Sequence, residues 1–308
     1  MKRNPVFDRE MRVSSRSARL PMILGLFNGT LFLVTLLNLY SVMLQVETSA
    51  AIQYGSFMEM YGFVTAIEFL LLLILAPAMT SGAISAEREK QTLELMLTTK
   101  MKPRDIVAGK LMSSMATLLL LLLSSVPAVA MVFIYGGITW LDAFLLILCY
   151  VTTAFFAGSL GICCSAIFRR STVSAVVTYV SLMMAVGGTY FLNKFSLSLS
   201  SMSTSLGSAY EAGEAAVSSG PMFGLFLLNP AVTFLAIVGE QGGRSFPFSR
   251  FCSRFGVDYR SFFMEHWVWF SILLQLLAGI LLLKIAARYV EPVKRNQKHS
   301  HFQKKGIE

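Results

Sequence analysis

The sequence predicts an all-α polytopic membrane protein with six transmembrane helices. Hydrophobic residues make up 55% of the chain and charged residues only 14%, and the mean hydropathy of +0.64 is too high for a soluble domain. A helix needs ~20 mainly apolar residues to cross a hydrocarbon layer of ~30 Å. Six stretches meet this requirement, namely 21–44, 57–84, 106–135, 141–168, 173–193 and 266–290.

The distribution of basic residues predicts the orientation of these spans. Six basic residues precede the first span, six lie after the second span up to and including Lys110, two connect the fourth and fifth spans, and seven lie from Lys284 onward. The short loops 45–56 and 136–140 contain none. Because basic loops are retained at the anionic inner leaflet, we expect both termini in the cytoplasm and no nucleic-acid partner despite the net charge of +9.

Residues 1–20 are predicted to form an amphipathic helix that lies in the inner membrane interface. On a helix, four arginines share one face: Arg9, Arg12, Arg16 and Arg19. The opposite face contains Phe7, Met11, Ser14 and Ala18. Such a helix places its apolar face in lipid and its arginines at the headgroups. The alternative is a basic leader without structure, but an Asp8–Arg12 pair at i,i+4 favours the helix.

Residues 194–265 form a long loop before the sixth span, expected on the outer side. Its first part is rich in Ser, Gly and Ala, which favours a flexible or weakly helical segment. It continues with the apolar stretch PMFGLFLLNPAVTFLAIVGE. We interpret this stretch as a re-entrant or interfacial helix pair broken near Asn229 and Pro230. A seventh full span would place the basic tail, 291–308, on the outer side, against the positive-inside rule.

A dense group of charges follows the second span. Ten of the 28 residues in 83–110 are charged, and we expect 83–105 to be a cytoplasmic segment. If this segment is helical, four of its residues share one face: Glu87, Lys90, Gln91 and Glu94. Pro103 suits the start of the next helix, and Lys110 would mark the inner interface by extending its ammonium group to the headgroups. Spacing alone leaves open whether this segment is functional or an ordinary solvated loop.

The run SAEREKQTLELMLTTKMKPRDIVAGK resembles the signature of ABC-2 type transporter permeases. Its shared features are a Glu-basic-Glu triplet, a Thr-x-Glu step, a proline and a Gly-Lys pair. The opening NPVFDREMR is similar to the start of many bacterial members, whereas Lys-Met-Lys before Pro103 departs from the pattern. The resemblance implies that 83–105 is a coupling helix that docks into an ATP-binding subunit. The contact residues would be Glu87, Arg88, Glu89, Lys90, Thr92 and Glu94.

The chain itself is not expected to bind ATP. A P-loop requires Gly-x-x-x-x-Gly-Lys-Ser/Thr, but Gly109-Lys110 is followed by Leu111, and Arg104 replaces the first glycine. The resemblance therefore implies a non-catalytic permease subunit of a bacterial inner-membrane exporter. ATP and Mg would bind to a separate ATPase, present in two copies per complex, and a second permease, identical or similar, would complete the pathway. The substrate would be lipid-like, a peptide or a hydrophobic compound.

Glu68 is the most costly residue within a predicted span, because an ionised acid near mid-bilayer costs roughly 2.5–3.5 kcal/mol. It would face the substrate pathway or a dimer partner, or it would form a structural hydrogen bond to a neighbouring span. An intramembrane enzyme would need a second catalytic group near Glu68, and none is visible. An ion channel or a membrane scaffold without ATP coupling remains the alternative. His299 and His301 lack the acidic or cysteine partners of a metal site.

Overall fold

The computed structural model describes residues 5–49, 54–93, 102–136, 138–207, 218–241, 248–257 and 262–290, which are helical apart from short turns and connections. The first half of the chain contains α1 (Pro5–Arg16), α2 (Arg19–Ser49), α3 (Tyr54–Thr80), α4 (Ser85–Glu89), α6 (Pro103–Gly136) and α7 (Trp140–Ile167). The second half contains α8 (Ser171–Met183), the π-helical turn η1 (Met184–Gly188), α9 (Thr189–Gly207), the 3₁₀ helix η2 (Gly220–Leu228), α10 (Pro230–Glu240), α11 (Phe248–Ser253), α12 (Phe262–Glu265) and α13 (Trp267–Val290).

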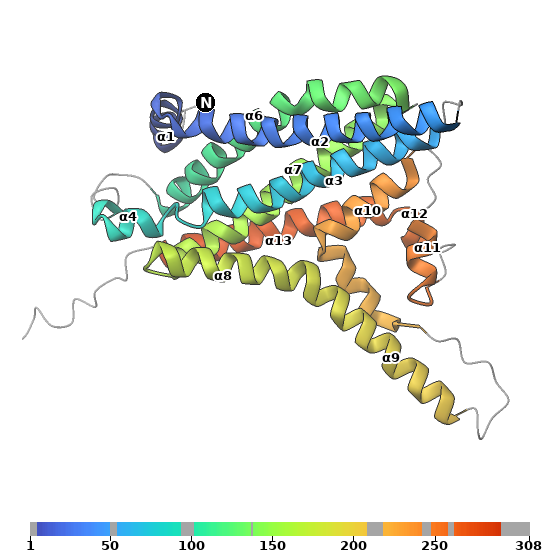
Figure 1. The fold of residues 1–308 in the computed structure, drawn as a ribbon. Helices are drawn as coiled ribbons and strands as arrows, with labels where there is room; N and C mark the ends of the chain where they lie inside the picture. Colours follow the sequence, from blue (N-terminus) through green and yellow to red (C-terminus); the bar gives the residue numbers. More distant parts are fainter. Residues whose placement is uncertain are drawn as a thin grey trace, which may run out of the picture.

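Within the described part of the chain, six helical segments are long and apolar enough to cross a membrane, as the sequence predicts. They are Leu20–Leu44, Met58–Glu89, Pro103–Pro127, Trp140–Ile167, Ser171–Ser203 and Trp267–Val290. Figure 1 shows α2, α3, α7 and α13 running along one bundle, with α1, α4 and the start of α8 at one end. We call this the α4 end. The protein is therefore an all-α polytopic membrane protein.

Helix α7 is the centre of the bundle, where it packs against α3, α6, α8, α10 and α13. Its contact with α3 depends on glycine. A Cβ atom at Gly161 would lie only 2.1 Å from Oγ1 of Thr80, whereas one at Gly158 would lie 3.2 Å from Cδ1 of Leu111. Small residues allow membrane helices to approach closely and to gain dispersion energy. Gly158 and Gly161 therefore permit the close packing of α7 on α3 and α6.

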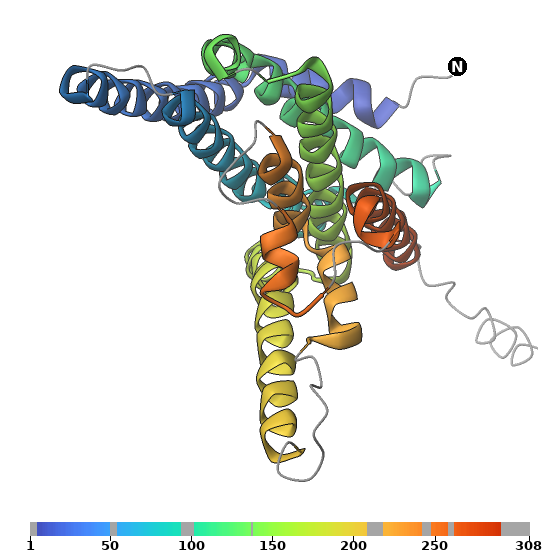
Figure 2. The same cartoon turned by 90° about the vertical axis from the view of Figure 1, so that its right-hand side faces the viewer.

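The fifth span is longer than predicted. It begins at Ser171, contains the π-helical turn η1, and continues as α9 to Gly207 instead of ending at residue 193. The hydroxyls of the serine-rich segment bond to carbonyls of the same helix, as when Ser201 Oγ donates to the Ser198 carbonyl at 2.8 Å, so these serines are satisfied without leaving the helix. Both views show α9 diverging from the other spans (Figures 1 and 2).

The broken helix pair predicted near Asn229 is present. Helices η2 and α10 meet at an angle of 91°. Pro230 opens α10, and Oδ1 of Asn229 caps it by accepting a hydrogen bond from the Ala231 amide at 2.9 Å. In α10, the ring of Phe234 stacks on Phe69 of α3 with centroids 4.5 Å apart. The pair is thus fixed to the core of the bundle.

Helix α1 is shorter than the helix predicted over residues 1–20. It ends at Arg16, and Arg19 is the first residue of α2, so Arg19 does not belong to the arginine face of α1. The side chains of Arg9, Arg12 and Arg16 are exposed. Helix α1 packs on α6. Val6 is buried in α1, and Phe7, Met11 and Ser14, on the face opposite the arginines, are partly buried.

Candidate functional site

Helix α4 occupies a tight corner that follows α3. It comprises only Ser85–Glu89, and Gln91 has a positive φ of 58° that turns the chain. The prediction of a continuous helix is therefore wrong, and so is the shared face predicted for Glu87, Lys90, Gln91 and Glu94. A left-handed residue ends a helix, because it redirects the backbone after the last turn. Glu94 lies outside the described residues.

The start of α4 is anchored by α7. The hydroxyl oxygen of Ser165 accepts hydrogen bonds from the backbone amides of Ile84 and Ser85, both at 2.9 Å. These amides have no partner within their own helix, so Ser165 acts as a cap from another helix. Nη1 of Arg88 also donates to the Ala166 carbonyl at 3.2 Å. These three bonds fix α4 against the end of α7.

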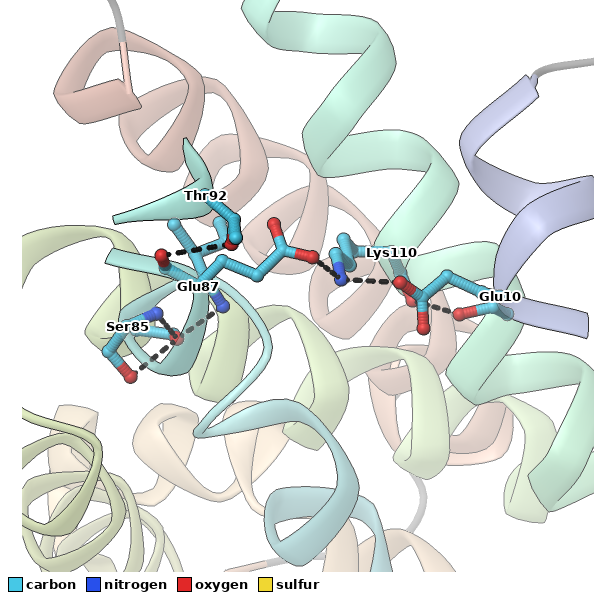
Figure 3. Close-up of polar contacts among 8 residues, drawn as sticks. Glu10, Ser85, Glu87, Thr92 and Lys110 are labelled. Atoms are coloured by element: carbon cyan, nitrogen blue, oxygen red, sulfur yellow. Dashed lines mark hydrogen bonds and ion pairs between the residues drawn. The ribbon is translucent and has the colours of Figure 1, made fainter. Parts of the chain in front are cut away.

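A buried lysine joins α4 to α1 and α6. Figure 3 shows Nζ of Lys110 between two carboxylates, 2.6 Å from Oε1 of Glu10 and 2.5 Å from Oε1 of Glu87. The Lys110 side chain is only 7% exposed, so it does not extend to the headgroups as predicted. We call these three residues the Lys110 cluster. Removing one partner from a buried ion pair costs about 3–5 kcal/mol because it leaves an uncompensated charge, so the three side chains depend on one another.

Glu89 caps the first turn of α8. Its Oε1 accepts a hydrogen bond from the Ser171 amide at 2.9 Å, and its Oε2 accepts one from the Ser171 hydroxyl at 2.8 Å. A carboxylate at a helix N-terminus satisfies free amides and interacts favourably with the helix dipole. Glu89 therefore joins the corner to the start of the fifth span.

Replacing Glu89 with alanine should loosen the start of α8. We expect hydrogen exchange to become several-fold faster at the Ser171 amide, because that amide loses its acceptor. Hydrogen exchange read by mass spectrometry on the purified protein tests this. Glu59→Ala removes another exposed carboxylate far along the chain and serves as the control. Equal exchange at Ser171 in both variants and the wild type would contradict the cap.

Two of the predicted docking residues, Glu89 and Lys90, are exposed, as is the neighbouring Gln91. Arg88 is partly buried, and Glu87 is 14% exposed at its side chain. Thr92 turns inward, and its hydroxyl donates to the Glu87 carbonyl at 3.2 Å (Figure 3). The next residue, Leu93, is buried in an apolar cluster with Val107 and Leu111. The exposed residues Glu89 to Gln91 thus form a short polar tip, and Thr92 and Leu93 hold the chain that follows it against the protein.

The sequence did not indicate the residues that hold this tip. Glu10 and Ser165 carry no local signal, because they lie about 80 or more residues away from their partners in the chain. Lys110 belongs to the Gly-Lys pair of the signature, which could have marked it as a partner for one of the acidic residues of the same signature.

Glu68 lies inside the core of the bundle, away from the α4 end. Its side chain accepts a hydrogen bond from the hydroxyl of Ser125 on α6, and the two residues are 2% and 1% exposed. The structure therefore shows the hydrogen bond to a neighbouring span, which is one of the two roles considered. A role of Glu68 in the substrate pathway remains a prediction.

Among the described residues, no group of three or more His, Cys, Asp and Glu side chains could hold a metal ion. The chain is similar to one known family over nearly its whole length. The family model described as "ABC-2 family transporter protein" matches residues 5–290. No curated protein matches the sequence.

Proposed function

Because the chain belongs to the ABC-2 family of transporter proteins, we propose that its α4 corner couples it to a separate ATP-binding subunit. The protein is a multi-pass membrane protein and a permease subunit of an ABC transporter. Such subunits are not catalytic in general. We propose that a separate ATP-binding subunit drives this permease subunit and acts on it at α4.

The observation that carries the proposal is the combination of exposure and anchoring in α4. Its tip, Glu89 to Gln91, is exposed, while its body is bonded to α6, α7 and α8 through Lys110, Ser165 and Ser171. A docking partner can shift the permease only if its contact energy differs between two conformations. A rigid tip passes a displacement on to the spans, whereas a flexible loop would absorb it.

Several observations support a cytoplasmic location for this tip. The α4 end carries basic residues on α1, α4, the start of α6 and the α7–α8 turn, all at least partly exposed: Arg9, Arg12, Arg16, Lys90, Lys102, Arg104, Arg169 and Arg170. Basic residues concentrate on the cytoplasmic side of inner-membrane proteins. We therefore propose a bacterial inner-membrane protein with α1 and the residues after α13 on the cytoplasmic side.

ATP and Mg are proposed to bind to the partner. Gly109 and Lys110 lie within helix α6, and the ammonium of Lys110 is paired with two carboxylates, so this Gly-Lys pair does not form a phosphate loop. We propose two copies of the ATP-binding subunit and a second permease subunit, identical or similar. The apolar spans suit export of a lipid-like, peptide or hydrophobic substrate.

A purification from the native host tests the proposal. The tagged chain is extracted in a mild detergent, its partners are identified by mass spectrometry, and ATPase activity is measured. A stoichiometric ATP-binding subunit is expected. If the chain is isolated alone and without ATPase activity from several mild detergents, an ion channel or a scaffold becomes the better interpretation.

Reversing the charge of Lys90 should weaken the complex without unfolding the permease. Lys90 is exposed at the tip, and charges at an interface rim control the encounter and the register of the partners. We expect Lys90→Glu to lower the affinity for the ATP-binding subunit about tenfold. Glu59→Lys, which reverses the charge of another exposed residue near the start of α3, is the matched control. Wild-type affinity in Lys90→Glu, measured by titrating the two purified subunits, would exclude the tip as the docking surface.

A further inference from the structure

We propose that Lys110 is a positioning residue that joins α1 to α4, so that the N-terminal helix moves with the coupling corner. This inference rests on the proposed function, because it assigns α1 to the same coupling unit. Helices α1 and α4 are far apart in sequence: Glu10 lies 100 residues before Lys110, and Glu87 lies 23 residues before it. They share this one ammonium group as a hydrogen-bond donor.

The charges of the Lys110 cluster make the lysine essential to it. Two carboxylates and one ammonium give a formal charge of −1, so Glu10 and Glu87 would repel each other without Lys110. The second oxygen of Glu87, Oε2, is buried and accepts no hydrogen bond from the described residues. No described group therefore takes over from Lys110 if its charge is removed.

The surroundings of the cluster strengthen these interactions. Val107 and Leu111, which are close to Lys110 in the sequence, are 2% and 4% exposed and pack with Ile84 and Leu93 around the α4 corner. A low local dielectric strengthens the attraction between opposite charges, and it also raises the cost of an unpaired charge. The Lys110–Glu87 pair is thus well shielded, and the Lys110–Glu10 pair, whose carboxylate is 31% exposed, adds an ionic contact to the packing of α1 on α6.

The cluster joins the ends of three spans. Helix α1 leads into α2 after a break at Ser17 and Ala18, α4 follows α3 after a short turn, and Lys110 itself lies near the start of α6. A displacement of α4 by a docked subunit therefore acts on α6 and, through Glu10, on α1 and α2. In the absence of Lys110, α4 would remain bonded to α7 and α8, but α1 would lose its ionic contact with the corner.

Distance measurements between spin labels test this connection on the permease in lipid nanodiscs. The labels are attached to Ser15→Cys on α1 and Gln91→Cys at the tip, both exposed positions, while the four native cysteines are buried. We expect a narrow distance distribution in the wild type and in Lys110→Arg, which keeps the charge. Lys110→Met should broaden the distribution and shift it to longer distances. The control, Lys102→Met, removes an exposed lysine near the start of α6 and should leave the distribution unchanged.

A gentler variant keeps the test decisive if Lys110→Met does not fold. Glu10→Ala removes the 31% exposed carboxylate and leaves the Lys110–Glu87 pair intact. We expect it to broaden the same distribution while the elution volume and helix content stay those of the wild type. An unchanged distribution in a folded Glu10→Ala or Lys110→Met variant overturns the proposal.

A coupling measurement separates a positioning role from a merely structural one. In the purified complex with its ATP-binding subunit, Glu10→Ala should reduce about tenfold the stimulation of ATP hydrolysis that the permease gives to that subunit, within the range of typical coupling free energies. Complex assembly should be retained, and Lys110→Arg should preserve the coupling. If no ATP-binding subunit associates with the wild type, the proposed function fails, whereas the spin-label result on the permease alone still decides whether Lys110 joins α1 to α4.

Discussion

Gly161→Ala is expected to destabilise the bundle more than Gly158→Ala or Gly25→Ala does. The added Cβ atom would lie 2.1 Å from Oγ1 of Thr80, 3.0 Å from its Cβ and 3.2 Å from the amide nitrogen of Ser81. Thr80 has little freedom to move away, because its hydroxyl donates to the Ala76 carbonyl at 2.8 Å and the side chain is fully buried. Helices α3 and α7 would therefore have to separate, at a cost of about 3 kcal/mol or more.

The unfolding of the purified protein in detergent measures this effect. Gly25→Ala is the matched control, since a Cβ atom at that position meets nothing within 4 Å. Gly158→Ala should fall between the two, because its nearest neighbour is the flexible end of Leu111 at 3.2 Å. Thr80→Ala combined with Gly161→Ala should recover part of the loss by removing Oγ1. Equal unfolding midpoints for Gly161→Ala and Gly25→Ala would show that α3 and α7 do not make this contact.

Asn229→Ala is expected to release the η2–α10 helix pair from the fifth span. The Asn229 side chain donates to the Val186 carbonyl at 2.9 Å and to Oγ1 of Thr189 at 2.8 Å, and it accepts from the Ala231 amide. It thus caps α10 and binds the π-helical turn η1 at the same time. A lost N-cap costs about 1 kcal/mol, and two lost buried hydrogen bonds add about 1 kcal/mol each.

An aspartate at position 229 distinguishes the two roles. Aspartate is as good an N-cap as asparagine, so Asn229→Asp would be neutral if the cap were the only role. It replaces the Nδ2 donor with an acceptor facing the Val186 carbonyl, and we expect it to destabilise at least as much as alanine. Asn38→Ala is the control, because Asn38 donates to the Val34 carbonyl of its own helix. Thermal unfolding and hydrogen exchange in α10 are the measurements, and a neutral Asn229→Asp variant would contradict the link to η1.

The fold class and the spans follow from the sequence because they depend on local composition. A stretch of ~20 apolar residues can satisfy its backbone in lipid only as a helix, whatever its neighbours are. The start of α10 also follows from local sequence, because Asn229 supplies an N-cap and Pro230 a first-turn proline. The end of the fifth span was not predicted, because serine hydroxyls that bond within α9 make a polar segment compatible with a helix.

The position of the candidate site in the chain was predicted from the sequence, but the contacts of its residues were not. The charged segment after α3 was identified, but the sequence could not show that Glu87 binds Lys110, that Glu89 caps α8, or that Glu68 meets Ser125. Each of these partners lies between 23 and 82 residues away in the chain, so no helical periodicity relates them.

The sequence by itself determined six apolar spans and the charged segment after the second of them. It also predicted the orientation of the spans. Only the tertiary structure decided which charges of the charged segment face outward. The reason is physical: hydropathy acts over a single helix, whereas the pairing of a buried charge depends on which helices meet. The turn at Gln91 and the approach of α1 to α6 bring Glu10, Glu87 and Lys110 together, and so leave Lys90 at the exposed tip.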